Sequence, residues 1–507
     1  MPLRSLFRRL PGNPIGRTRT GASRRRDARR WKPRVELLED RSVPTVQVGT
    51  NFAGQTSLDS PWGPPDPIAA VGPNHVVEMV NENIAIYNKA TGALISNQTT
   101  SSFWGTTHFP GDVQVMYDEL AGRFVASAVD FMDDGGRVYF AVSNSSDPTQ
   151  PWAEKHIIDL QNPTGVGPVW GDFDKLVGTA DAYVIKFNTV AQPGSTGGGP
   201  AEVSIARSSA LDTNPATLTA YQAAFPYWNA LPAKKHNSVA GDPVCFIQAW
   251  TTNSVLMTKM TNLLSSTPTY TDYTVSVPAY TNATGALQPG GVISVGSGFS
   301  DGGTMRGNTR WAIALPIAAP ATNVSYLRWY EFNVSGTPFL IQNGTIQPGT
   351  RKSAFNSSVE VNVNGDIGVT YMQSGPNQYP SMYVAGRKVT DGTGTMQAGK
   401  LVKSGSAALN GRYGDYAGIG IDPANGTTFW ACNEYVPANS GWGTWIGSFA
   451  FSGALAAPTR MSPAGSNGGS DQTIHPSETQ PPDPRIRRWQ AWIEVELAKS
   501  KLSPNAR

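Results

Sequence analysis

Four aspartates in this sequence each follow a glycine at the start of an apolar or aromatic run, and a fifth follows a proline. Several carboxylates converging from separate strands would offer the hard oxygen ligands that Ca²⁺ or Mg²⁺ prefers. Alternatively, each aspartate caps its own turn or accepts hydrogen bonds from the backbone of a neighbouring strand, as aspartate commonly does. Both interpretations stay open, with Ca²⁺ as the possible ion. The steps are Gly111-Asp112, Gly171-Asp172, Gly241-Asp242 and Gly414-Asp415, with Pro65-Asp66 as a looser member, and the candidate metal ligands are Asp112, Asp172, Asp242 and Asp415.

The stretch from Arg412 to Glu434 combines a cation and two carboxylates with two short strands. Arg412 stands three residues before Asp415, and Glu434-Tyr435 closes an aromatic run. Carboxylates beside a guanidinium can bind a polar ligand, and a pair of carboxylates can work as acid and base. The candidate catalytic residues are therefore Asp415, Glu434 and Tyr435, and the candidate ligand-binding residues are Arg351, Arg412 and Asp172.

The elements that must position these residues are short strands. The chain of 507 residues contains 53 glycines and 39 prolines, with 10% aromatic and only 15% charged residues. Glycine and proline punctuate strands and interrupt helices, so this composition is typical of an all-β protein. Seven candidate units of three to four strands recur between residues 45 and 457, and each has the content of one propeller blade. We therefore predict a β-propeller of seven blades, with six or eight as alternatives.

Charge is distributed unevenly along the chain. Residues 1–41 hold 13 Lys and Arg against 4 Asp and Glu, which leaves 27 against 33 for the remainder. A mildly acidic body with scattered cations argues against nucleic-acid binding by the main domain. No apolar run is long enough to cross a membrane as a helix, and the five histidines lack metal-ligand spacing. The two cysteines, Cys245 and Cys432, fall in units four and seven, too far apart to bond, so we expect two buried free thiols.

The two ends of the chain differ from the repeats. Residues 1–44 lack the apolar core of a secretory signal. Their many basic residues and few apolar ones predict a disordered arm. Residues 458–482 have the composition of a flexible linker, and 483–502 predict an amphipathic helix with Asp483 as N-cap and Pro484 at its first position. We expect that helix to lie on its own protein, with a partner or a membrane surface as the alternative.

Some motifs also resemble known families. The block from Pro33 to Pro44 is similar to the leader of many planctomycete cell-surface and exported proteins, which implies export. The last unit resembles the final blade of a family of exported bacterial propeller proteins in the sialidase-like superfamily, a family that implies no assigned reaction. That similarity rests on Arg412-Tyr413-Gly414-Asp415-Tyr416, Asp422-Pro423, Thr428-Phe429-Trp430 and Asn433-Glu434-Tyr435.

Sialidases bind an acidic sugar with clustered arginines and use a Tyr-Glu pair and an aspartate in glycoside cleavage. Arg351, Arg412 beside Asp415, Glu434-Tyr435, and Arg306 with Arg310 supply the elements of such a site. However, the Arg-Ile-Pro start of sialidases is missing, and residues 300–304 are only distantly similar to their repeated Asp boxes.

The leading functional hypothesis is an extracellular or cell-surface binding scaffold that takes carbohydrate or protein at the mouth of the central channel, and this hypothesis favours a protein that is not an enzyme. A sialidase-like glycoside hydrolase is the alternative, and a structural envelope protein is the third. A glycan or a cell-envelope protein is the expected partner, and we expect a monomer.

Overall fold

The computed structural model describes residues 45–60, 62–130, 136–152, 154–212, 218–296, 298–308, 310–438 and 441–452. These residues are almost entirely β-strand, and the two described helices, α1 (Thr100–Trp104) and α2 (Arg207–Ala210), are single turns. All described strands belong to one compact unit, Pro44–Arg507. The predicted leader (1–44), linker (458–482) and helix (483–502) lie outside the described residues. Within the described part, no helix has the length and apolar character needed to cross a membrane.

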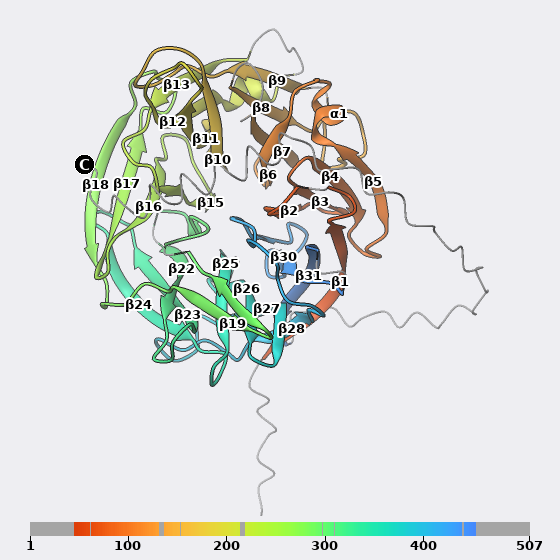
Figure 1. Cartoon of the computed structure of the whole chain (residues 1–507). Helices are drawn as coiled ribbons and strands as arrows, with labels where there is room; N and C mark the ends of the chain where they lie inside the picture. Colours follow the sequence, from red (N-terminus) through yellow and green to blue (C-terminus); the bar gives the residue numbers. More distant parts are fainter. Residues whose placement is uncertain are drawn as a thin grey trace, which may run out of the picture. The chain divides into compact units, whose positions relative to one another are not determined.

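Seven sheets follow one another around a central axis, as Figure 1 shows. This confirms the prediction of an all-β propeller with seven blades rather than six or eight. The four strands of each of the first three blades occur in chain order, with the first strand innermost. Blade 1 holds β2 (Ile68–Val71), β3 (His75–Val80), β4 (Asn83–Asn88) and β5 (Leu94–Thr99); blade 2 holds β6 (Pro110–Asp118), β7 (Arg123–Asp130), β8 (Arg137–Val142) and β9 (Glu154–Asp159); blade 3 holds β10 (Val169–Gly178), β11 (Ala182–Ala191), β12 (Gly198–Ala206) and β13 (Ala220–Ala224).

Blade 6 keeps this simple order, whereas blades 4, 5 and 7 depart from it. A separate two-stranded hairpin, β19 (Gly285–Gln288) with β20 (Gly291–Ser294), lies in the chain between the last strand of blade 4 and β21 of blade 5, and packs against blade 6. Blade 4 holds β14 (Leu231–Pro232), β16 (Val244–Thr251), β17 (Ser254–Thr261) and β18 (Thr269–Ser276), and blade 5 holds β15 (Lys234–His236), β21 (Thr304–Arg306), β22 (Arg310–Ala318), β23 (Ser325–Asn333) and β24 (Phe339–Ile346). Blade 6 holds β25 (Ser353–Val361), β26 (Ile367–Gly375), β27 (Gln378–Arg387) and β28 (Lys400–Lys403). Blade 7 holds β29 (Gly418–Ile421), β30 (Phe429–Tyr435), β31 (Gly443–Phe451) and, from the start of the described chain, β1 (Val46–Thr56).

The turn between β25 and β26 shows how the sequence builds a blade. Val361 pairs with Ile367, and the side-chain oxygen of Asn362 accepts hydrogen bonds from the backbone N–H groups of Asn364 and Asp366. Gly365 has φ +81°, a conformation that glycine adopts without the steric cost of a Cβ atom. An asparagine that bonds its own turn, followed by a glycine, is the chemistry such hairpins need.

The first and last strands of the described part close the ring. β1 pairs antiparallel with β31, from Val46 opposite Phe451 to Thr56 opposite Gly443. Val46 is buried and packs with Phe449 and Phe451 in one apolar cluster. Because a closed ring leaves no open blade interface, this pairing protects the apolar faces of blades 7 and 1.

Candidate functional site

Four of the aspartates singled out in the sequence lie close together near the starts of the innermost strands. Asp66 precedes β2, Asp112 and Asp172 lie in β6 and β10, and Asp415 precedes β29. The Asp415 backbone N–H donates to Asp66 Oδ1 at 2.5 Å, the Phe173 N–H donates to Asp112 Oδ2 at 2.6 Å, and the Asp112 and Asp172 side chains are hydrogen-bonded. Blades 7, 1, 2 and 3 thus each contribute one carboxylate to an acidic cluster, defined by Asp66, Asp112, Asp172 and Asp415.

An irregular backbone positions these side chains. Asp66, Asp112 and Phe173 have φ values of +50°, +45° and +57°, in the left-handed region that non-glycine residues rarely adopt. The pairing register shifts between Gly111 and Gln114 in β6, and between Asp172 and Lys175 in β10. Such bulges redirect side chains, and each strained residue costs on the order of 1–3 kcal/mol, which the surrounding structure must offset.

The carboxylates of the acidic cluster have different roles. Asp66 and Asp112 each accept a backbone N–H from an adjacent blade, so they connect blade 1 to blade 7 and blade 2 to blade 3. Asp415 forms an ion pair with Arg412, and these two side chains are 40% and 35% exposed. Asp172 bonds only to the Asp112 side chain among its described contacts. Asp172, Asp415 and Arg412 therefore remain available to a ligand.

Burial and mutual repulsion alter the protonation of the cluster. Burial raises the pKa of Asp66, Asp112 and Asp172, and nearby carboxylates raise it further. Burial also raises the pKa of Glu434 to about 8, although its Oε2 accepts the Gly414 N–H at 2.7 Å. Asp66, Asp112 and Asp172 therefore bind protons more readily than free aspartates do.

Lys175 lies beside the acidic cluster. Its Nζ is 3.8 Å from the centre of the Phe173 ring and 3.1 Å from that of the Tyr416 ring. Burial lowers the pKa of Lys175 to about 8, although the carboxylates of Asp174 and Asp415 oppose this shift. Sequence reasoning missed Lys175, because nothing in the run Asp174-Lys175 shows that a bulge turns this side chain toward two rings.

Several predicted site residues lie elsewhere. Asp242 lies in the turn before β16, the second strand of its sheet, and bonds the Val239 N–H and Lys235, both at 2.8 Å. It therefore does not join the acidic cluster. Within the described residues, Arg351 is exposed in the turn before β25 and forms no ion pair.

Glu434 and Tyr435 do not act as a pair. Because successive side chains of a strand point to opposite faces, Tyr435 packs edge-on against Trp445 while Glu434 bonds Gly414. Arg306 and Arg310 also separate, since Arg306 donates to the Val361 carbonyl and Arg310 pairs with Glu331. Among the ion pairs of the described residues, the one that joins an arginine to the acidic cluster is Arg412 with Asp415, so the clustered arginines of a sialidase do not pair with it.

No group of three or more His, Cys, Asp or Glu side chains within the described ranges is arranged to hold a metal ion. The hydrogen bonds of the cluster explain this result, because Asp66 and Asp112 direct oxygens at backbone N–H groups. Cys245 and Cys432 are both buried and free, as predicted.

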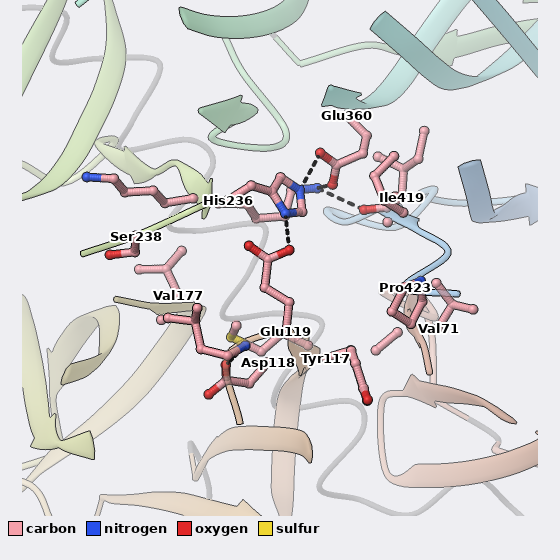
Figure 2. A pocket seen from close by; sticks show the side chains of 18 of the residues that line it. Val71, Tyr117, Asp118, Glu119, Val177, His236, Ser238, Glu360, Ile419 and Pro423 are labelled. Atoms are coloured by element: carbon pink, nitrogen blue, oxygen red, sulfur yellow. Dashed lines mark hydrogen bonds and ion pairs between the residues drawn. The ribbon is translucent and has the colours of Figure 1, made fainter. Parts of the chain in front are cut away.

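A second group of charged residues lies near the other ends of the innermost strands, around a pocket of about 290 Å³ (Figure 2). His236 Nδ1 contacts Glu119 Oε2 at 2.9 Å, and its Nε2 contacts Glu360 Oε1 at 3.0 Å. Burial alone would lower the pKa of His236, but the two carboxylates outweigh it and raise the pKa to about 9. Sequence reasoning missed this bridge, because its residues come from blades 2, 5 and 6.

No protein-family model matches the chain, and no curated protein matches it either. Among solved structures, an alpha-L-arabinofuranosidase from Fusarium graminearum is 10% identical, with 79% of this chain and 97% of that chain covered and a TM-score of 0.37. A Penicillium chrysogenum alpha-L-arabinanase is 9% identical, with 81% and 100% covered and a TM-score of 0.36. Drosophila Semaphorin 1b is 7% identical, with 80% and 87% covered and a TM-score of 0.37. Because these scores and identities are so low, we draw no inference from the neighbours.

Proposed function

We propose that the protein is a carbohydrate-binding propeller whose ligand occupies the acidic cluster. The observation that carries this proposal is the convergence of Asp172, Asp415 and Arg412 from blades 3 and 7, with polar groups that the fold leaves available. Carboxylates accept hydrogen bonds from sugar hydroxyl groups, and a guanidinium donates to sugar oxygens. A few convergent polar groups beside an aromatic face, here Phe173, are typical of a small-molecule site. On the resemblance of its leader, we also propose that the protein is exported.

The proposal is tested by glycan-array binding with the full chain and the variants Asp172→Asn and Asp415→Asn. We expect each variant to lose about tenfold or more in affinity, since a lost charge-assisted hydrogen bond costs about 1.5–3 kcal/mol. Asp159→Asn is the matched control, because that side chain is 92% exposed and lies outside the cluster. Melting temperatures of all variants must be compared, and unchanged binding by both cluster variants would contradict the proposal.

Glycoside hydrolysis is the second candidate, favoured by one observation. Asp172 and Asp415 act on each other electrostatically but differ in environment: burial raises the pKa of Asp172, whereas Arg412 pairs with Asp415. Two carboxyl groups in different environments are what an acid and a base or nucleophile in glycoside cleavage require. A panel of fluorogenic glycosides separates the two functions, since turnover that disappears in both Asp172→Asn and Asp415→Asn would favour the hydrolase.

A further inference from the structure

The acidic cluster and its surroundings contain more carboxyl groups than cationic groups. Asp174 and Glu434 lie near the four aspartates, since each interacts electrostatically with a member of the cluster. The cations acting on the cluster from the described residues include Arg412, Lys175 and Lys186. Three cations therefore face six carboxyl groups, and Arg412 is already paired with Asp415. A neutral sugar would leave this imbalance unchanged, whereas a cationic group would reduce it.

The unequal numbers of carboxyl and cationic groups affect proton binding. Burial, followed by neighbouring carboxylates, raises the pKa of Asp66 and Asp172, so these groups bind protons more readily than free carboxyl groups do, and a bound cation would oppose this. The arrangement does not suit a metal ion, because Asp66 and Asp112 use oxygens to accept backbone N–H groups. An ammonium group is a better match, since it donates hydrogen bonds and needs no closed shell of oxygen ligands.

Two buried polar groups beside the carboxylates also lack hydrogen-bond partners, although the Lys175 ammonium lies over two aromatic rings. Lys175 is 7% exposed and Tyr416 is 3% exposed, and within the described part of the chain neither Lys175 Nζ nor the Tyr416 hydroxyl has a hydrogen-bond partner. Both interact electrostatically with Asp66, Asp112 and Asp415. Because an unsatisfied buried polar group costs about 1–3 kcal/mol, such groups gather where a ligand supplies the missing bonds. Hydroxyl groups on the ligand would supply them here.

We infer that the ligand is a cationic amino sugar, a glycan whose glucosamine-type residues carry free ammonium groups. This inference rests on the proposed carbohydrate site and specifies the chemical class of its ligand. The ammonium group donates to the carboxylates of Asp172 and Asp415, and the sugar hydroxyls face Arg412 and the buried polar groups. Binding releases protons from the cluster, so affinity rises with pH as long as the amino groups of the glycan stay protonated.

The test compares two hexasaccharides of equal length by titration calorimetry with the full chain. One is a hexamer of glucosamine, which is cationic, and the other is its fully N-acetylated counterpart, which is neutral. We expect the cationic hexamer to bind at least about tenfold more tightly at low ionic strength. Titrations in two buffers of different ionisation enthalpy should show proton release for the cationic hexamer only. Asp172→Asn should reduce the preference, while Asp159→Asn, which changes the net charge equally, should retain it.

Each outcome decides a separate point. Equal binding of the two hexamers would overturn the inference and leave the carbohydrate site in place, whereas binding of neither would count against the proposed function itself. If Asp172→Asn and Asp159→Asn reduced the preference for the cationic hexamer equally, binding would reflect general attraction to an acidic surface. That result would also overturn the inference. Should Asp172→Asn fail to fold, Glu434→Gln replaces it, because glutamine keeps the acceptor for the Gly414 N–H and removes one carboxylate. We expect this variant also to bind the cationic hexamer more weakly.

Discussion

At the scale of single residues, the two ends of the innermost strands use charge in different ways. Near their starts, the acidic cluster has an excess of carboxyl groups, and burial raises the pKa of Asp66, Asp112 and Asp172. Near the other ends, His236 lies between Glu119 and Glu360, so every charge in that bridge has a partner. A site with unmatched charge is available for binding, whereas a matched bridge mainly holds elements together.

The His236 bridge makes stability depend on pH. The pKa of His236 is raised from 6.5 to about 9, so its contribution is complete below pH 6.5 and is lost as the pH rises through 9. The pKa values of Glu119 and Glu360 are lowered, so their contributions are present above 4.5 and are lost in acid. We expect His236→Gln to cost about 3 kcal/mol in the free energy of unfolding, because two carboxylates lose their cation.

Urea unfolding of the wild type and His236→Gln at pH 6.5 and pH 9 checks this prediction. The difference between the two proteins should be largest at pH 6.5 and should shrink at pH 9, where the wild-type imidazole loses its charge. Glu119→Gln should move the alkaline loss of stability to lower pH, since only one carboxylate then holds the proton. An equal difference at both pH values would show that the charge of His236 does not matter.

At the scale of elements, blades pack so closely that some positions leave no room for a methyl group. A Cβ atom on Gly368 in β26 would lie 2.6 Å from the Phe429 ring of β30. On Gly420 in β29, the nearest atom would be a Val71 methyl carbon at 3.8 Å, an ordinary contact. The contact between blades 6 and 7 therefore depends on a glycine, whereas that between blades 7 and 1 tolerates a methyl group here.

We expect Gly368→Ala to destabilise the protein by about 1–3 kcal/mol, because extra volume in a well-packed interface forces neighbours out of position. Gly420→Ala is the matched control and should change stability by less than about 0.5 kcal/mol. Chemical denaturation of the two variants gives both values. Equal stability of the two would mean that Phe429 rotates away without cost.

At the scale of the whole molecule, ring closure depends on contacts between the two ends of the described chain. Glu78 of blade 1 connects this closure to the next blade, because it accepts hydrogen bonds from the Gln55 N–H at 3.0 Å and from the Thr444 hydroxyl. The Tyr87 hydroxyl and the Cys432 thiol also donate to Glu78. One buried carboxylate therefore connects β1, β4, β30 and β31.

A charge placed inside the closing strand should weaken the entire ring. We expect Val46→Asp to destabilise the protein by about 3 kcal/mol or more, because the carboxylate would be buried among aromatic side chains without a partner. Gln47→Asp is the control, since that neighbouring side chain is exposed. Calorimetric melting should show a large drop for Val46→Asp alone, and a small drop would indicate that closure by β1 adds little to stability.

The sequence alone determined the architecture, because residues close together in the chain specify its turns and strands. Turns such as Asn364-Gly365 and short apolar runs specify hairpins within about 60 residues, and seven such units give the blade number. The sequence also marked Asp112, Asp172 and Asp415, since a repeated glycine-aspartate step is visible without a structure.

Only the tertiary structure decided which marked residues meet. Asp242 shares the motif but lies before the second strand of its sheet, so it bonds Lys235 instead of the cluster. Asp66 meets Asp415 across 349 positions, and His236 meets Glu360 across 124. Spacing in the sequence contains no information on such contacts, because ring closure and the bulges of the innermost strands set them. The position of Tyr435 is also set by the fold, because successive side chains of a strand point to opposite faces and Tyr435 therefore points away from Glu434.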